Sequence, residues 1–70
     1  AYENLGIAYA MKKDFPSSLK AFEQALQLKP ESAQSYLNIA ITYQNMGDKQ
    51  KADEYFEKAF KIDPALRQAK

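Results

Sequence analysis

One stretch of this sequence occurs twice, with a spacing of 34 residues and no gap. The first copy reads Tyr2-x-x-Leu5-Gly6-x-x-Tyr9 and then Ser18-x-x-x-Phe22-x-x-Ala25-x-x-x-x-Pro30. The second copy reads Tyr36-x-x-Ile39-Ala40-x-x-Tyr43 and then Ala52-x-x-x-Phe56-x-x-Ala59-x-x-x-x-Pro64. A fixed period of this length is typical of proteins in which similar units stack on one another. The repeat therefore constrains the fold more tightly than it constrains the function.

The composition excludes several classes of protein. With 46% hydrophobic and 27% charged residues, the chain of 70 residues has enough apolar material for one small domain. Its net charge of +1 is not the excess of positive charge that would indicate binding to nucleic acid or to an acidic membrane surface. No apolar run is long enough to span a membrane. Cysteine and histidine are absent, so the usual parts of a nucleophile–base site and of a transition-metal site are missing. We therefore expect no cofactor, no metal and no enzymatic activity.

The apolar spacing predicts an all-α fold of four helices and a short fifth. Positions 2, 5, 6 and 9 follow the i, i+3, i+4, i+7 pattern that places them on one core-facing stripe. The expected helices cover residues 1–12, 15–28, 33–46 and 49–62, followed by a stub at 65–70. Because the connections are short, neighbouring helices are expected to run antiparallel as helical hairpins. Both ends of the sequence fall inside helical patterns, and we therefore expect a segment of a longer array.

Residues that favour helix ends stand at most of the expected boundaries. Asp14, Ser32 and Asp48 are expected to cap the helices that follow them, because their side chains accept hydrogen bonds from free backbone N–H groups. Gly47 is expected to take the left-handed conformation that ends a helix. Pro30 disfavours helical geometry at the residue before it and so ends the second helix.

The second helix of each unit is expected to bury one stripe, anchored by a phenylalanine. The two stripes are Ser18, Phe22, Ala25 and Leu28, and Ala52, Phe56, Ala59 and Ile62. Gly6 is expected where another helix crosses closely, because no side chain is needed there. On the outer face, favourable i,i+4 ion pairs are expected between Glu54 and Lys58 and between Glu57 and Lys61.

These residues resemble the tetratricopeptide repeat family, whose 34-residue helix–turn–helix unit carries the same anchors. The resemblance covers residues 1–64 and implies one repeat at 1–30, a second at 31–64, and a further or capping helix starting at 65–70. Three departures are mild. Tyrosine stands at 2 and 36 where the family often has tryptophan, and Ser18 replaces alanine. Lys13 replaces the glycine that is present at Gly47, so the first turn is expected to be strained or closed differently.

The resemblance also implies a concave groove, lined by the first helix of each hairpin, that binds a peptide or a helix of a partner protein. The implied lining residues are Asn4, Ile7, Met11, Gln34, Leu37, Asn38, Ile41 and Asn45. In some family members stacked asparagines bond a peptide backbone, and an amide can pair with any peptide unit. Asn4 and Asn38 lie one repeat apart and are candidates for such a ladder. The alternative is that they bond only within their own repeats.

Other features of this face favour simpler interpretations. The basic clamp with which some family members hold a C-terminal carboxylate is disfavoured, because Glu3, Ile7 and Leu37 stand on the matching face. Tyr9 and Tyr43 are expected to pack in the core.

A structural role is the rival to peptide binding. In it the chain is a stacking or oligomerisation unit whose surfaces serve other repeats. Phe60 and Ile62 are expected to remain exposed, because the stub at 65–70 is too short to cover them, and exposed apolar ends tend to associate. We therefore expect self-association through this end.

Overall fold

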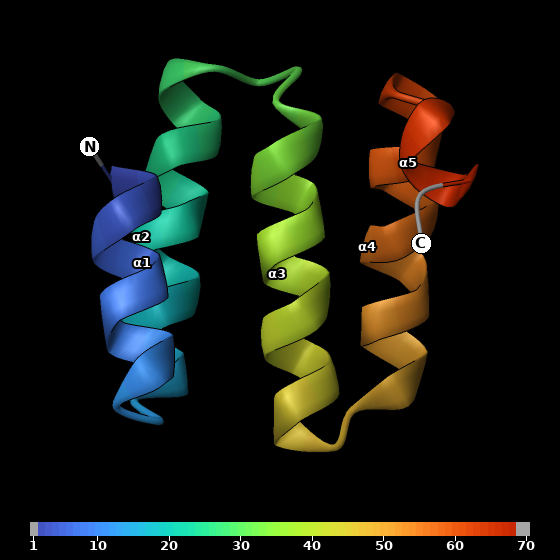
Figure 1. The fold of residues 1–70 in the computed structure, drawn as a ribbon. Helices are drawn as coiled ribbons and strands as arrows, with labels where there is room; N and C mark the ends of the chain where they lie inside the picture. Colours follow the sequence, from blue (N-terminus) through green and yellow to red (C-terminus); the bar gives the residue numbers. More distant parts are fainter. Residues whose placement is uncertain (1, 69–70) are drawn as a thin grey trace.

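The chain folds into a row of helices that run alternately down and up (Figure 1). The computed structural model describes residues 2–68. Its helices are α1 (Tyr2–Met11), α2 (Phe15–Leu28), α3 (Ala33–Met46), α4 (Lys49–Ile62) and α5 (Ala65–Gln68). Helices α1 and α2 form one hairpin, α3 and α4 form the next, and α3 packs against both helices of the first hairpin. The described residues contain no strand. The described part of the chain is thus all-α and consists of two stacked helical hairpins and a short fifth helix, as predicted.

The ring of Phe22 lies at the centre of the core and is only 1% exposed. A Cβ atom built on Gly6 would lie 2.5 Å from Cε1 of this ring, far inside van der Waals contact. Helix α1 can therefore approach α2 this closely only because residue 6 has no side chain. The buried hydroxyl of Ser18 donates a hydrogen bond to the carbonyl oxygen of Gly6 at 2.8 Å. The predicted close crossing is confirmed, and the serine there has a partner for its polar atom.

Small side chains fill most of the remaining core. Apart from Phe22 and Ile39, the buried apolar residues are Ala21, Ala25, Ala40, Ala52 and Ala59. Small residues at a helix contact allow the helix axes to come close together. The large buried apolar side chains, Phe22 and Ile39, come from α2 and α3, so the core is centred where the two hairpins meet.

The two hairpin turns have the same hydrogen-bond pattern although their sequences differ. The amide N–H of Asp14 donates to Tyr9 across the first turn, and that of Asp48 donates to Tyr43 across the second, both at 2.9 Å. Lys13 has a φ of 63° where Gly47 has 86°. The first turn is therefore closed in the same way as the second, and a lysine bears the left-handed conformation that glycine adopts without strain.

The predicted N-caps are confirmed at two of three helices. Ser32 accepts a hydrogen bond from the N–H of Ser35, and Asp48 accepts one from the N–H of Lys51. Asp14 occupies the N-cap position of α2, but its side chain makes no capping hydrogen bond. The helix after Asp14 begins where expected, but the predicted hydrogen bond from its backbone to the Asp14 side chain is not formed, so that prediction was wrong.

Phe56 is not the buried anchor that the repeat predicts, because it is only half-buried. Its counterpart Phe22 packs against Gly6, whereas the equivalent position before Phe56 is Ala40, whose methyl group is fully buried. Phe56 instead stacks on Phe60, with ring centroids 6.0 Å apart. Helix α3 also packs against α2, whereas among the described residues only the short α5 follows α4.

Four other residues predicted for the core are exposed. Leu28 is 71% exposed, and Ile62, Tyr2 and Leu5 are exposed to a lesser degree. Each lies on the apolar stripe of its helix, but no described helix covers it. The periodicity identified the apolar side of the helix correctly and overestimated how much of that side is packed.

The charged residues of α4 have partners other than those predicted. The carboxylate of Glu57 pairs with Arg67 of α5 at 2.8 Å, and neither predicted i,i+4 pair forms among the described residues. The guanidinium group of Arg67 also lies 4.9 Å from the centroid of the Phe60 ring. Lys58 lies over Tyr55, 4.8 Å from its ring centroid. The short α5 therefore covers part of Phe60, contrary to expectation.

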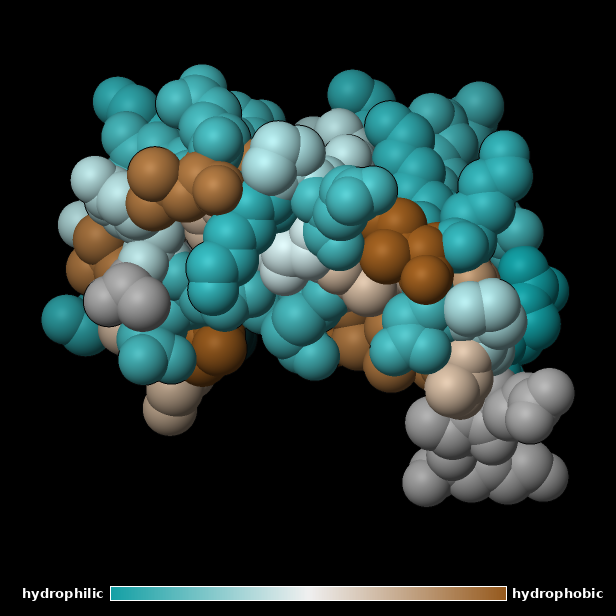
Figure 2. Space-filling view, turned by 90° about the horizontal axis from the view of Figure 1, so that it is seen from above, coloured by the Kyte–Doolittle hydropathy of each residue, from teal (hydrophilic) through white to brown (hydrophobic). Residues whose placement is uncertain are grey.

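The surface seen from the top of Figure 1 is mixed in character. Figure 2 shows brown apolar side chains in separate patches among hydrophilic ones. No described helix is both long enough and apolar enough to cross a membrane.

We predict that the two phenylalanines contribute unequally to stability. Phe22→Ala removes a fully buried ring and should lower the free energy of unfolding by about 3–5 kcal/mol, leaving this small chain largely unfolded at room temperature. Phe56→Ala should cost clearly less, because its ring is half exposed. Urea unfolding followed by circular dichroism measures both. Equal losses in the two variants would contradict the assigned packing.

We further predict that Lys13→Gly stabilises the chain. Glycine removes the strain of a left-handed lysine, although it also gives the unfolded chain more conformational entropy. The free energy of unfolding should therefore rise by about 0.5–1 kcal/mol. Lys12→Gly is the matched control, because its φ is not positive. That control should lower the melting temperature, and a similar loss in Lys13→Gly would contradict the strain at this turn.

Candidate binding groove

A shallow groove of about 380 Å³ lies between α1 and α3. It is lined by Ile7, Ala10 and Met11 of α1, Phe22 of α2, and Asn38, Ile41, Thr42 and Asn45 of α3. The structure thus brings together five of the eight residues predicted for the concave face: Ile7, Met11, Asn38, Ile41 and Asn45. The other three, Asn4, Gln34 and Leu37, are not part of this lining.

The groove follows from helical spacing and from the core beneath it. Positions 7 and 11 are one turn apart on α1, and positions 38, 41 and 45 follow i, i+3, i+7 on α3, so each set forms one stripe. Phe22 contributes to the lining although it is almost fully buried, which places its ring at the floor. The residue that centres the core therefore also supports the groove.

Asn38 is the most constrained polar residue of the groove. Its side-chain oxygen accepts a hydrogen bond from Nε2 of Gln34 at 3.3 Å. Its backbone carbonyl accepts one from Oγ1 of Thr42 at 2.9 Å. Its side-chain nitrogen Nδ2 is buried and has no hydrogen-bond partner within residues 2–68. Such an unpaired buried donor is uncommon in proteins and needs an explanation.

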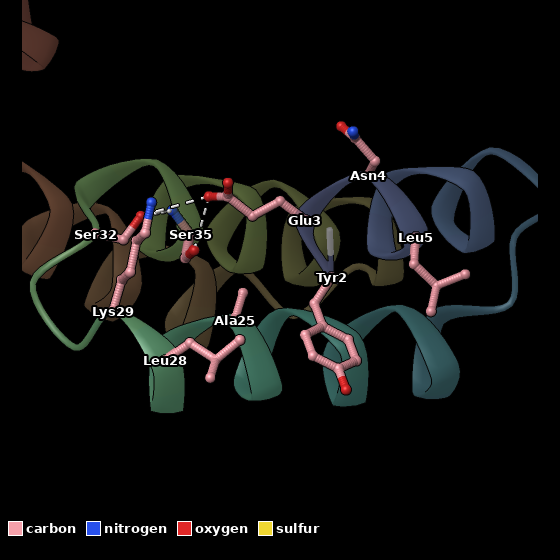
Figure 3. Close-up of a pocket in the computed structure, with 9 residues that line it drawn as sticks. All are labelled: Tyr2, Glu3, Asn4, Leu5, Ala25, Leu28, Lys29, Ser32 and Ser35. Atoms are coloured by element: carbon pink, nitrogen blue, oxygen red, sulfur yellow. Dashed lines mark hydrogen bonds between the residues drawn. The ribbon is translucent and has the colours of Figure 1, made fainter.

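Asn4 does not meet Asn38 in one cavity. It lines a second, larger cavity of about 670 Å³, which we name the end cavity: Tyr2, Glu3, Asn4, Leu5, Ala25, Leu28, Lys29, Ser32 and Ser35. Figure 3 shows the side chain of Tyr2 extending over α2, while Asn4 points away from it. Sequence reasoning missed the end cavity, because it assigned Tyr2, Leu5 and Leu28 to the packed core.

Glu3 joins the first helix to the start of α3. Its carboxylate accepts a hydrogen bond from the hydroxyl of Ser35 at 2.9 Å and a longer one from Ser32 at 3.4 Å (Figure 3). Hydrogen bonds to a charged group are stronger than neutral ones, and a carboxylate is favourable near a helix N-terminus. Glu3 thus links the first hairpin to the second through hydrogen bonds. None of the residues that line the groove is basic.

The tyrosines of the second hairpin form a stack. The ring of Tyr55 on α4 lies 5.5 Å from Tyr43 and 6.2 Å from Tyr36, measured between centroids. Lys51 and Lys58 lie over this stack. Tyr43 therefore packs between helices, but it is only half-buried, so it does not lie in the core to the extent predicted.

Within residues 2–68, no cluster of three acidic, histidine or cysteine side chains could hold a metal ion. The arrangement instead offers an uncharged surface with apolar walls and amide groups. Such a surface is suited to contacts with another polypeptide.

Two comparisons with known proteins agree with this architecture. A family model described as tetratricopeptide repeat matches residues 1–65. The crystal structure of MamA is similar, with a TM-score of 0.84 and 25% sequence identity. That match covers 97% of this chain but only 40% of the MamA chain, so the chain spans less than half the length of that protein.

Proposed function

Because the chain belongs to the tetratricopeptide repeat family, whose repeats are generally protein-interaction modules, we propose that its groove binds an extended peptide or a helix of a partner protein. In this proposal residues 1–30 and 31–64 are the two repeats, and 65–70 begins a further or capping helix. The binding face includes the groove and the neighbouring Asn4, Gln34 and Leu37. Members of this family generally act as scaffolds rather than enzymes.

The observation that carries the proposal is the exposure of three large apolar side chains in one groove. Ile7 and Met11 of α1 and Ile41 of α3 are exposed, and all three line the groove. Met11 is 80% exposed. Single exposed apolar side chains are common on protein surfaces, but several around one depression mark interaction sites.

The asparagines supply the second part of the proposal. Asn38 lines the groove, and Asn4 is exposed on α1 one repeat earlier. An extended peptide that runs along α1 and α3 could bond both amides through its backbone, whatever its sequence. The two sites need not share a cavity for such a ladder.

We predict that Asn4→Ala combined with Asn38→Ala weakens a peptide selected against this chain by phage display. Each lost neutral hydrogen bond should reduce the binding free energy by about 0.5–1.5 kcal/mol. Isothermal titration calorimetry measures the change, and circular dichroism checks that the fold is kept. A double change of exposed amides elsewhere, Gln27→Ala with Gln50→Ala, is the matched control. Unchanged affinity in the asparagine variant would refute the ladder.

A second candidate function, assembly through the ends of the stack, is favoured by a comparison of equivalent positions. Leu5 is 45% exposed, whereas Ile39, which stands 34 residues later, is 2% exposed because α3 packs against the first hairpin. Likewise Ala8 is exposed, whereas Thr42 at the equivalent position of the second repeat is buried. The outer face of α1 thus has the apolar character of a surface that elsewhere in this chain is covered by a helix. At the other end Ile62 is exposed and Phe60 is half-buried.

If the ends associate, the mean mass should rise with concentration. Sedimentation equilibrium over a wide concentration range should then show a smaller rise for Leu5→Glu and for Phe60→Glu, because each variant places a charge in the contact. Met46→Glu is the control, since Met46 is exposed away from both ends. A monomer mass at every concentration would exclude the assembly function and leave peptide binding as the proposal.

A further inference from the structure

Three tyrosine rings and two lysine side chains form a surface between α3 and α4 that is separate from the groove. Tyr55 of α4 lies between Tyr36 and Tyr43 of α3. The Nζ atom of Lys58 lies 4.8 Å from the ring centroid of Tyr55 and 5.9 Å from that of Tyr36. The Nζ atom of Lys51 lies 5.6 Å from the ring centroid of Tyr43. None of these five residues lines the groove, and we call them the tyrosine–lysine face.

The first hairpin shows that the hairpin fold does not require this face. Thirty-four residues before Tyr55 and its two lysines, the first repeat has Ser17, Ala21 and Gln24. The two hairpins nevertheless have the same order of helices, and their turns are closed by the same pattern of hydrogen bonds. The ring of Tyr55 and the two ammonium groups over the stack are therefore particular to the second hairpin.

The charged groups of this face have no partner of opposite charge among the described residues. Both lysines are exposed, and within residues 2–68 neither forms an ion pair. The hydroxyl groups of the three tyrosines make no hydrogen bond within that range either. The face of an aromatic ring attracts an ammonium group, so the tyrosines restrain both lysines before any ligand arrives. Such preorganisation lowers the entropic cost of binding.

We propose that the tyrosine–lysine face binds an extended acidic segment of a partner protein, with two carboxylates three residues apart. The Cα atoms of Lys51 and Lys58 lie two helical turns apart, which is about 10.5 Å along α4. Residues three apart in a polyproline II segment project on the same side and are about 9.3 Å apart. Each carboxylate then meets one ammonium group, and the tyrosine hydroxyls are further donors. This surface goes beyond the function proposed for the groove.

One acidic side chain opposes this binding and supplies a test of its sign. Glu54 stands between the two lysines in the sequence, is exposed, and forms an ion pair with neither. A carboxylate of the ligand near both lysines would be repelled by it. Glu54→Gln should therefore strengthen an acidic peptide by about twofold, whereas loss of a lysine should weaken it.

The test uses three short peptides that take the polyproline II conformation. Acetyl-Glu-Pro-Pro-Glu-amide has the proposed spacing, acetyl-Glu-Glu-Pro-Pro-amide has the same composition with adjacent carboxylates, and acetyl-Gln-Pro-Pro-Gln-amide is neutral. Nuclear magnetic resonance suits their weak binding, because it reports the rings of Tyr36, Tyr43 and Tyr55 separately. We expect the first peptide to bind about fivefold more tightly than the neutral one, with the second peptide between them. About 0.5 M sodium chloride should remove most of this difference by screening.

Two pairs of lysine variants test the position of the charges. Lys51→Gln combined with Lys58→Gln should remove the fivefold preference. Lys49→Gln combined with Lys61→Gln is the matched control, because it makes the same change in net charge at exposed positions of the same helix. This control should keep the preference.

A further variant tests the part played by the tyrosine ring. Tyr55→Leu keeps an apolar side chain but removes the ring that lies beneath Lys58. It should weaken the acidic peptide by about twofold although both lysines are present, and circular dichroism checks that the fold is kept. Tyr55→Phe keeps the ring and loses only the hydroxyl group, so it should bind more tightly than Tyr55→Leu.

The outcomes distinguish this surface from a general attraction between charges. If the neutral peptide binds as tightly as the acidic ones, or if the two pairs of lysine variants lose equally, the proposal is wrong. If a short DNA oligonucleotide binds more tightly than every peptide and depends on the same two lysines, the partner is a nucleic acid and the acidic segment is wrong. None of these variants changes a residue that lines the groove, so failure here would leave the proposed groove function standing.

Discussion

The contact between the Phe22 ring and the bare backbone of Gly6 sets the geometry of this chain. It brings α1 close to α2, and the hydroxyl of Ser18 bonds the carbonyl of Gly6 at the same place. Helix α3 then packs on both, with Ile39 buried at the junction. Because Phe22 also forms the floor of the groove, the spacing of the groove walls depends on this one helix crossing.

The second hairpin has the same sequence pattern but lacks this contact, and only the short α5 follows it among the described residues. Ala40 stands at the position equivalent to Gly6, and Phe56 is half-buried in a stack with Phe60. Aromatic contacts join α3 and α4 instead. Tyr55 lies between two other tyrosines, and Lys58 lies over its ring. Aromatic pairs and cation–π contacts at half-exposed positions contribute less than a fully buried ring. The first hairpin and its junction with α3 are therefore expected to hold most of the stability.

Much of the fold could be predicted from local rules. The repeat period located the helices, and Ser32, Asp48 and Gly47 ended them for the expected reasons, because caps and turns depend on a few adjacent residues. Burial could not be predicted as well. Leu28 follows the apolar stripe yet is exposed, since periodicity shows which side of a helix is apolar and not whether another helix covers it. Likewise Glu57 pairs with Arg67, a partner ten residues away that helical spacing does not indicate.

The same limit applies to the groove. Its stripes were predictable, because Ile7 with Met11 and Asn38 with Ile41 share helix faces. The sequence could not show that Asn4 stands outside the groove, because that depends on how α3 is offset along α1. Nor could it show the unpaired nitrogen of Asn38, which depends on the geometry of its neighbours.

A double-mutant cycle between Gly6→Ala and Phe22→Leu tests most directly whether the close helix crossing controls the structure. Alanine has a higher helix propensity than glycine by about 1 kcal/mol, so it should stabilise α1 wherever its methyl group fits. The account predicts that Gly6→Ala lowers the free energy of unfolding in the parent, where its Cβ would meet the ring at 2.5 Å. It also predicts that the same change is neutral or stabilising once Phe22 is leucine, which gives a coupling free energy of about 1 kcal/mol or more. If Gly6→Ala stabilised both backgrounds equally, the crossing would not depend on this contact, and the central claim would be wrong.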